Sequence, residues 1–488
     1  MVLRRSKPFY SLWCLLIALL KLSACYGYTS RALKDKIDNL PGTEHFDVTF
    51  QQFSGYLNVS ETKMIHYWFV ESMQDPVNDP ILFWTNGGPG CSGMLGFFWE
   101  LGPFKPNSDQ TLSLNKYSWN QISNILFVES PCSVGFSYST ATNTDTDYTT
   151  GDTLTAHDNY ILLQEFYHRF PQYAMNRLYL GSESYGGHYI PQLAQTIVNR
   201  NKMSRFPTIN LTGITIGNPY TTTYSGSQAM YETLWFHQLY SKPLWDEFEL
   251  NCKTDFTSDD CYWTTKKIDA QIGERNFYGL DFPMCRLVSD AKHTAEQVVS
   301  LLHHIHENRK DKLNARMTSN NGDIKSTFLN PSKSLRYEPC IHDYTRLYLN
   351  QPTVKAAIHV KKDITWMKCS EVLQYQYTDM DISMVPIYQY LIDGEYELDI
   401  LIFSGDDDSV CSTLGTQDWI WNLGYDVSEP AWQTYSVKNQ PSGYLTKWKG
   451  KKLGFLTVHG AGHEVPLFKP DVAFTMFQDY LAGKLTNG

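Results

Sequence analysis

The stretch Leu-Tyr-Leu-Gly-Ser-Glu-Ser-Tyr-Gly-Gly, residues 178–187, decides the fold of this chain. A short apolar run meets a turn of small residues, and a helix-like stretch follows over Tyr189–Val198. A strand, a tight turn and a helix in this order form a nucleophile elbow, which exposes the serine at its apex. The usual pattern is Gly-x-Ser-x-Gly, and here Ser182 replaces the first glycine. Ser184 is the predicted nucleophile, and an ordinary Ser/Gly loop is the alternative.

Other short apolar runs extend this unit into a sheet. They are Ile81–Thr85, Ile125–Val128, Ile214–Ile216, Ile400–Phe403 and Phe455–Val458. Helix-like stretches such as Thr153–Arg169 lie between several of them. Strands that alternate with helices predict an α/β fold, with a mostly parallel central sheet and helices on both faces. Residues 220–334 break this rhythm and are predicted to form an inserted cap, between core segments 28–219 and 335–488.

The N-terminus predicts entry into the secretory pathway. Basic residues at positions 4, 5 and 7 precede an apolar run over Phe9–Leu20, and small residues follow at positions 23 and 24. This is the layout of a cleaved signal peptide, here residues 1–27, and the run is too short for a membrane helix. Leu22–Cys25 leaves a bacterial lipoprotein signal as the alternative. We expect a secreted, vacuolar or lysosomal protein without stable membrane insertion.

Composition and cysteine content limit the function classes. The net charge of −10 lacks the basic footprint of a nucleic-acid binder, and 42% hydrophobic residues suffice for a sizeable core. Without Cys14 and Cys25, eight cysteines remain, and their spacing does not give the pairing. Neither the cysteine spacing nor the histidines at 303, 304 and 306 indicate a metal. Asn58 and Asn210 begin N-glycosylation sequons.

A serine nucleophile needs a base, and the base needs an orienting acid. In a fold with a nucleophile elbow these follow in the order Ser, acid, His, each just beyond a strand. The run Asp406–Asp408 offers three acids after one apolar run, and His459 and His463 offer two bases after the next. Turn aspartates and a core histidine are the alternative.

A glycine-rich segment follows the first apolar run. Trp84–Gly93 contains four glycines, which leave backbone amides open to a ligand. An oxyanion hole requires such an amide together with the N–H of the residue after the nucleophile, Tyr185. A phosphate-binding loop is excluded because no Gly-Lys-Ser/Thr follows.

Five blocks in this order resemble the serine carboxypeptidase family. They are Trp84–Gly93, Glu129–Pro131 with Val134–Tyr138, Glu183–Gly187, Ser404–Asp408 and Gly460–Pro466, and the resemblance extends over roughly residues 46–481. It implies an α/β-hydrolase fold with Ser184 as nucleophile, His463 as base and Asp408 as orienting acid. It also implies that Gly88 and Tyr185 bind the oxyanion, and that no cofactor or metal is needed.

The resemblance further implies a site for the terminal carboxylate of a peptide. The matching residues are Trp84, Asn86, Gly87, Glu100 and Glu183. Two close carboxyl groups cannot both ionise cheaply, so one holds a proton and can donate a hydrogen bond to a substrate carboxylate. We therefore expect the best activity at acidic pH. Without the resemblance, Glu100 would be interpreted as a solvated charge.

The resemblance also bears on the cysteines and on specificity. It implies a Cys91–Cys340 disulfide and an unpaired Cys411 thiol, while Cys252 and Cys261 are expected to form a local pair in the insertion. Glu464 follows the predicted base, at a place where relatives that accept basic terminal residues often carry Glu. We expect cleavage of basic as well as apolar terminal residues.

Two other functions compete with peptide hydrolysis. Acyl transferases of the same fold tend to lose the equivalents of Asn86 and Glu183, and this chain keeps both. A non-catalytic binding protein is disfavoured by the complete Ser–Asp–His set. The predicted partners are peptide or protein C-termini, and the oligomeric state stays open, a homodimer included.

Overall fold

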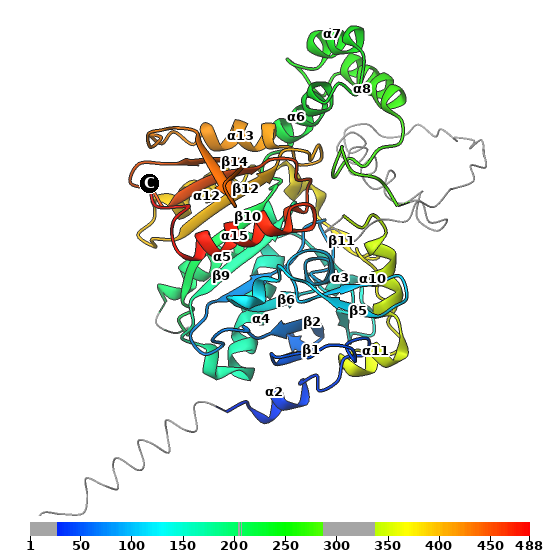
Figure 1. The fold of residues 1–488 in the computed structure, drawn as a ribbon, viewed down its shortest axis with the longest axis vertical. Coiled ribbons are helices and arrows are strands. Elements are labelled where there is room, and N and C mark those ends of the chain that lie inside the picture. The colour runs from blue at the N-terminus through cyan, green and yellow to red at the C-terminus, as the bar shows by residue number, and fades with distance from the viewer. Residues whose placement is uncertain (1–26, 204, 206, 286–336) are drawn as a thin grey trace, which may run out of the picture.

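A mixed sheet of eleven strands forms the centre of the protein in a computed structural model (Figure 1). The structure describes residues 27–285, except positions 204 and 206, and residues 337–488. Along the sheet the strands are β1 (Gln52–Asn58), β2 (Lys63–Val70), β6 (Asn124–Val128), β3 (Ile81–Trp84), β9 (Leu178–Glu183), β10 (Leu211–Gly217), β12 (Asp399–Gly405), β15 (Leu453–Val458), β14 (Gln440–Lys447) and β13 (Gln433–Val437), and β7 (Tyr138–Ser139) pairs with β2. Two small sheets pair β4 (Phe104–Pro106) with β5 (Leu112–Leu114), and β8 (Thr149–Thr150) with β11 (Gln374–Tyr375).

The six central strands, from β6 to β15, run parallel to one another. They coincide with the six apolar runs of the sequence, and the predicted α/β fold is confirmed. Parallel strands that are covered on both faces have nearly continuous apolar sequences, which explains why these strands could be recognised in the sequence. The antiparallel strands β1 and β2 could not be recognised in the same way, because they bury polar side chains. Ser54 of β1 and His66 of β2, for example, are fully buried and hydrogen-bond each other at 2.9 Å.

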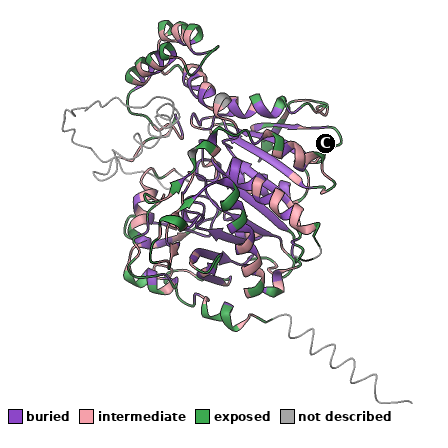
Figure 2. Ribbon diagram, turned by 180° about the vertical axis from the view of Figure 1, so that it is seen from behind, coloured by how far each residue is buried: buried purple, intermediate pink, exposed green. Residues whose placement is uncertain are grey.

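Helices cover both faces of the sheet, and Figure 2 shows its strands as largely buried. Within β3, Ile81 and Phe83 pack into one apolar core, while Leu82 and Trp84 pack into the other. The first core includes α4 (Asp152–Arg169), α5 (Gly186–Asn201), α12 (Val385–Asp393) and α13 (Thr413–Trp421). The second includes η1 (Gly96–Glu100), α10 (Ile341–Leu349), α11 (Pro352–Ala357), α14 (Val465–Phe468) and α15 (Pro470–Leu481). The short elements are α2 (Ser30–Lys34), α3 (Asp145–Tyr148), η2 (Trp119–Gln121), η3 (Pro171–Tyr173) and η4 (Tyr377–Asp381).

Between β10 and β12 the chain forms three helices that project from one end of the sheet (Figure 1). These are α6 (Thr223–Phe236), α7 (Lys242–Asn251) and α8 (Asp259–Ile272), which share a separate apolar cluster around Phe248 and Ile268. The cap limits 220 and 334 stay predictions, and residue 334 lies outside the described residues. So do histidines 303, 304 and 306, and the signal peptide apart from Gly27.

The disulfides correct one expectation. Cys252–Cys261 forms as expected, but Cys91 pairs with Cys369, and Cys340 pairs with Cys285. The expected Cys91–Cys340 pairing is wrong because a local β-bridge places Cys91 opposite Cys369, with 3.9 Å between their Cα atoms. Two backbone hydrogen bonds flank this bridge, from Ser92 N to Lys368 O and from Ser370 N to Gly90 O. Cys340 lies instead beside Cys285, with 4.8 Å between their Cα atoms, which is within the usual range for a disulfide.

Surface features bear on the secretory interpretation. The sequon asparagines Asn58 and Asn210 are both exposed, although the Asn210 amide donates to the carbonyl of Met175 at 3.1 Å. Among the described helices, none has the length and apolar character needed to span a bilayer. Glycosylation of either asparagine stays a prediction.

Candidate active site

Ser184 occupies the turn between β9 and α5. Its φ is +59°, a left-handed value that is uncommon for a residue with a side chain and typical of a strained nucleophile elbow. The turn is fixed by backbone bonds from Ser184 N to Gly217 O at 3.0 Å and from Gly187 N to Ser184 O at 2.9 Å. The structure therefore places Ser184 at the turn between a strand and a helix, and its role as nucleophile stays a prediction.

Ser182 fits where a glycine is usual because its neighbours make room. Its hydroxyl donates to the Thr85 carbonyl at 2.6 Å, and the side chain is fully buried. A Cβ on Gly186 would lie 2.0 Å from the Ser182 hydroxyl oxygen, so the helix start must be glycine here. The departure from the usual pattern is thus accommodated by one hydrogen bond and one missing Cβ, and the elbow keeps its shape.

His463 and Asp408 form a buried pair on neighbouring loops. Asp408 follows β12 and His463 follows β15, and His463 Nδ1 lies 2.6 Å from Asp408 Oδ2. The carboxylate also accepts from the amides of Val410 and Cys411, at 2.8 and 3.1 Å, and from Asn218 Nδ2 at 3.0 Å. These donors hold the carboxylate in place, and it accepts a hydrogen bond from the Nδ1–H of His463 and so orients the imidazole.

The other members of the aspartate run have different partners. Asp406 pairs with His459 Nδ1 at 2.7 Å, on the exposed side of the same two loops. Asp407 points toward the cap, where His237 Nδ1 lies 3.8 Å from its Oδ1. Of the three acids and two bases that the sequence offered, His463 lines the pocket that contains Ser184. Asp408 does not line it but is hydrogen-bonded to His463.

The electrostatic surroundings of His463 stabilise its charged form. Burial alone lowers the pKa of His463, but the ionised Asp408, and to a lesser degree Glu464 and Glu100, raise it to about 9. A stabilised imidazolium favours removal of a proton from a serine hydroxyl, because this is the state that the transfer creates. It also means that the resting base has to lose a proton first. Protonation of Glu100 and Glu464 at acidic pH removes two of the raising contributions.

The glycine-rich segment after β3 packs directly against the elbow. A Cβ on Gly87 would lie 2.5 Å from the amide nitrogen of Tyr185 and 2.9 Å from the Ser184 Cβ. Gly88 has a φ of +122°, a value that only glycine adopts readily. Gly88 and Tyr185 line the same pocket as Ser184, as a pair of oxyanion donors would.

Beside the elbow, the predicted carboxylate-binding residues form a buried network around Asn86. Asn86 Nδ2 donates to Glu183 at 2.7 Å and to Glu100 at 3.0 Å, while Asn86 Oδ1 accepts from Trp84 Nε1 at 3.0 Å. Asn86, Gly87 and Glu183 line the pocket, whereas Trp84 and Glu100 lie behind them and hold them in place. The structure brings these five residues together in two layers, and their binding of a carboxylate stays a prediction.

The two glutamates of this network, Glu100 and Glu183, both have raised pKa values. Burial, followed by the charge of Glu464, raises the pKa of Glu100 to about 7. Burial and the charge of Glu100 raise the pKa of Glu183 well above its ordinary value. Both carboxyl groups accept a hydrogen bond from Asn86 Nδ2, which brings them close together and makes simultaneous ionisation costly. At acidic and neutral pH the pair therefore retains at least one proton, and the protonated group can donate a hydrogen bond.

The pocket has a volume of about 390 Å³, and Glu464 and Lys368 both line it. Glu464 is partly exposed, and burial raises its pKa while the charges of His463 and Lys368 lower it. The predicted specificity residue thus faces the pocket beside a lysine. Cys411 has no disulfide partner and lines the pocket, and burial raises the pKa of its thiol well above the ordinary value. Cys132 is the other free cysteine among the described residues.

Comparison with known sequences agrees with this arrangement. The sequence profile named Serine carboxypeptidase matches residues 41–483. The chain belongs to the serine carboxypeptidase family. It is 36% identical to serine carboxypeptidase-like 25 of Arabidopsis thaliana, over 94% of this chain and 93% of that protein. It is equally 36% identical to serine carboxypeptidase 24 of the same plant, over 97% of each chain. Family membership makes this chain a serine-type carboxypeptidase.

A solved structure supports the fold of this family member. Kex1Δp, a prohormone-processing carboxypeptidase from Saccharomyces cerevisiae, superposes with a TM-score of 0.71 over 92% of this chain and 96% of its own. The two sequences are 20% identical, so the match speaks for the α/β-hydrolase fold alone. The disulfides and the plant relatives are consistent with a protein of the secretory pathway.

Two residues near this site were not anticipated from the sequence. Asn218 follows β10 and binds Asp408, and a polar residue directly after an apolar run could have indicated it. Asp152 lies at the start of α4 and accepts hydrogen bonds from Tyr185 at 3.0 Å, His188 at 2.8 Å and Tyr375. It supports the side chain of the predicted oxyanion donor, and no local sequence signal marks it.

Proposed function

We propose that Ser184, His463 and Asp408 carry out the hydrolysis of the last peptide bond of a chain. Ser184 Oγ attacks the carbonyl carbon and passes its proton to His463, which Asp408 orients. The C–N bond then breaks, and the amine of the terminal residue leaves with that proton. Water, deprotonated by His463, cleaves the resulting ester and regenerates Ser184. The buried Asp408–His463 pair at the pocket that holds Ser184 is the observation that carries this proposal.

The amides of Gly88 and Tyr185 are proposed to bind the oxyanion during both steps. The contact of Gly87 with the Tyr185 amide supports this, because a larger residue would displace the donor. Gly87→Ala should therefore lower kcat by about 100-fold, the size of effect expected when one oxyanion donor is misplaced. Gly450→Ala is the control for glycine replacement away from the site, since nothing lies within 4 Å of its added Cβ and Gly450 does not line the pocket. Its φ of +65° strains an alanine, so this variant should lose some stability and keep its kcat.

The Asn86–Glu100–Glu183 network is proposed to select the chain end. A protonated glutamate and the Asn86 amide can each donate a hydrogen bond to a terminal carboxylate. A peptide carbonyl within the chain is neutral, so it would bind more weakly to the same donors. As pH rises through about 7, Glu100 loses its proton and the network becomes more negative. KM for free-acid peptides should then rise, while KM for the matching C-terminal amides should stay level. Equal rises for both would contradict this role.

Release of free leucine from an N-blocked dipeptide between pH 4 and 8 tests the proposed activity. Wild type should release it, Ser184→Ala should not, and a fluorophosphonate should label wild type at Ser184 alone. Ser182→Ala is the control, because Ser182 faces the Thr85 carbonyl and not the pocket. Labelling at Ser182, or turnover by Ser184→Ala, would refute the assignment.

We further propose that Glu464 admits basic terminal residues. It follows the base that protonates the leaving amine, so its carboxylate can reach the side chain of that residue. Lys368 lies in the same pocket and competes for this carboxylate. Glu464→Gln should lower the Arg-to-Leu ratio of kcat/KM, and Lys368→Met should raise it. An unchanged ratio in Glu464→Gln would remove Glu464 from the specificity site.

We also propose that the protein is glycosylated and resides in a lumen of the secretory pathway. The predicted signal peptide and the exposed sequons at Asn58 and Asn210 support a glycosylated protein of a secretory, vacuolar or lysosomal lumen. Glycosidase treatment of protein secreted by eukaryotic cells should reduce its apparent mass. A mass unaffected by glycosidase would contradict glycan attachment at both positions.

A further inference from the structure

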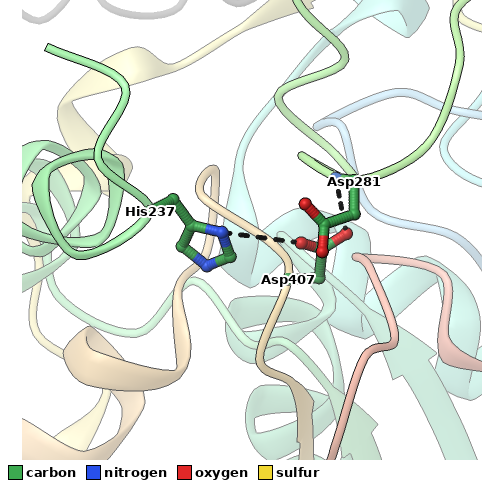
Figure 3. A group of neighbouring side chains, drawn as sticks. All are labelled: His237, Asp281 and Asp407. Atoms are coloured by element: carbon green, nitrogen blue, oxygen red, sulfur yellow. Dashed lines mark hydrogen bonds and ion pairs between the residues drawn. The ribbon is translucent and has the colours of Figure 1, made fainter.

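Three side chains from distant parts of the chain meet between the cap helices and the sheet (Figure 3). His237 follows α6, Asp281 lies in the segment after α8, and Asp407 lies in the loop after β12. Each offers one ligand atom, and these atoms lie within 4.8 Å of one another. Asp407 directly precedes Asp408 in the sequence, but none of the three residues lines the pocket.

The carboxylate of Asp407 is incompletely satisfied. Only 2% of the residue is exposed, and its Oδ2 accepts from the Asp281 amide at 3.1 Å. Its buried Oδ1 has no hydrogen-bond partner, and His237 Nδ1, at 3.8 Å, is too far to provide one. Figure 3 shows this oxygen directed toward the imidazole, with the Asp281 carboxylate alongside. A buried carboxylate oxygen next to a second carboxylate is costly unless a cation compensates it.

We propose that His237, Asp281 and Asp407 bind a divalent cation of the Zn²⁺ type. One imidazole nitrogen with two carboxylate oxygens suits first-row ions such as Zn²⁺ or Co²⁺ better than Ca²⁺ or Mg²⁺, which prefer oxygen alone. Tetrahedral Zn²⁺ bonds of about 2.0–2.2 Å place neighbouring ligand atoms about 3.4 Å apart, so the three side chains close in by about 1 Å. Asp281 is exposed, which leaves water as the fourth ligand.

Such an ion would join the cap to the loops of the catalytic pair. The segment that carries Asp281 already docks on these loops, through hydrogen bonds from Leu280 N to Asp407 O at 3.1 Å and from His463 N to Tyr278 O at 2.7 Å. The cation adds the end of α6 to this contact. Its role is structural, since none of its ligands lines the pocket and the proposed chemistry needs no metal.

Metal binding to the mature protein, first stripped with a chelator, tests this site. Zn²⁺ is titrated at pH 7 by calorimetry, and Co²⁺ is followed by its visible absorption, which reports low-coordinate nitrogen and oxygen ligation. Wild type should bind one equivalent of Zn²⁺. The Kd of His237→Gln and that of Asp281→Asn should each be more than about 100-fold higher. Loss of outer-shell partners alone costs about 10–100-fold, and loss of a ligand should cost more.

The matched control is His459→Gln, which removes the histidine of the exposed Asp406 pair on the same loops and should leave the affinity unchanged. Zn²⁺ should also raise the Tm of wild type but not of Asp281→Asn, because a ligand stabilises only the state that binds it. Absence of binding by wild type at 100 µM Zn²⁺ would overturn the proposal. So would wild-type affinity in His237→Gln or Asp281→Asn, or displacement of Zn²⁺ by an equal concentration of Ca²⁺.

Discussion

The loops after β12 and β15 contain two His–Asp pairs of the same chemistry and opposite surroundings. The Asp408–His463 and Asp406–His459 contacts measure 2.6 and 2.7 Å. The side chain of His463 is 3% exposed, whereas that of His459 is 77% exposed. Water and salt screen the outer pair, while the inner pair interacts in a low-dielectric site beside a nucleophile. Burial, and not the presence of the pair, distinguishes a candidate catalytic dyad from a surface contact.

The largest expected difference is in catalysis. Asp408→Asn should lower kcat/KM by about 10⁴-fold, because the imidazole loses the acceptor that sets its tautomer, as in other serine hydrolases. Asp406→Asn should stay within about twofold of wild type. Hydrolysis of one N-blocked dipeptide at a fixed pH measures both. Comparable losses in the two variants would erase the distinction between the pairs.

The second difference lies in what supports each carboxylate. Asn218 Nδ2 donates to Asp408 at 3.0 Å, and Asn218 Oδ1 accepts from Gly405 N at 2.9 Å, so Asn218 supports the inner acid and not Asp406. A buried hydrogen bond to a charged group contributes about 1.5–3 kcal/mol. Asn218→Ala should therefore reduce kcat about 10–100-fold with little change in KM. A change confined to KM would show that Asn218 acts on substrate binding instead.

A third prediction concerns the charges around the inner histidine. Ionised Glu100 is one of the groups that raise the pKa of His463. Glu100→Gln should move the acidic limb of the pH profile for ester substrates to lower pH, because His463 then loses its proton more easily. His459→Gln should leave this limb in place. A shift to higher pH in Glu100→Gln would contradict the assigned sign.

The same substitution has a consequence for stability. The folded-state pKa of Glu100, about 7, lies above its ordinary value of 4.5, so the folded state binds more protons between these pH values. This contribution is fully present below pH 4.5 and is lost as pH rises through about 7. The Tm of wild type should therefore fall from pH 5 to 7.5 by more than that of Glu100→Gln. Parallel curves would show that Glu100 titrates normally.

The smallest expected effect belongs to the outer pair. Exposed ion pairs contribute about 0–1 kcal/mol, and salt weakens them further. His459→Ala should change the Tm by about 1 °C or less at low salt and by nothing measurable in 0.5 M NaCl. A larger loss that persists in salt would indicate that this pair is structurally as important as the inner one.

The sequence by itself determined the parallel core and the elbow. Six continuous apolar runs became the six parallel strands because strands buried on both faces have to be apolar throughout. Ser184 was identifiable because a strand, a tight turn and a helix are local features. The edge strands escaped detection because buried polar residues such as His66 find their partners only after folding.

Tertiary structure decided which residues meet. Three consecutive aspartates look equivalent along the chain, yet each one points to a different histidine: Asp406 to His459, Asp407 to His237, Asp408 to His463. The family resemblance selected Asp408, and spacing could not. Likewise a β-bridge, and not the cysteine spacing, joined Cys91 to Cys369. Local sequence specifies local backbone geometry, whereas pairings between distant segments depend on how the whole sheet brings its loops together.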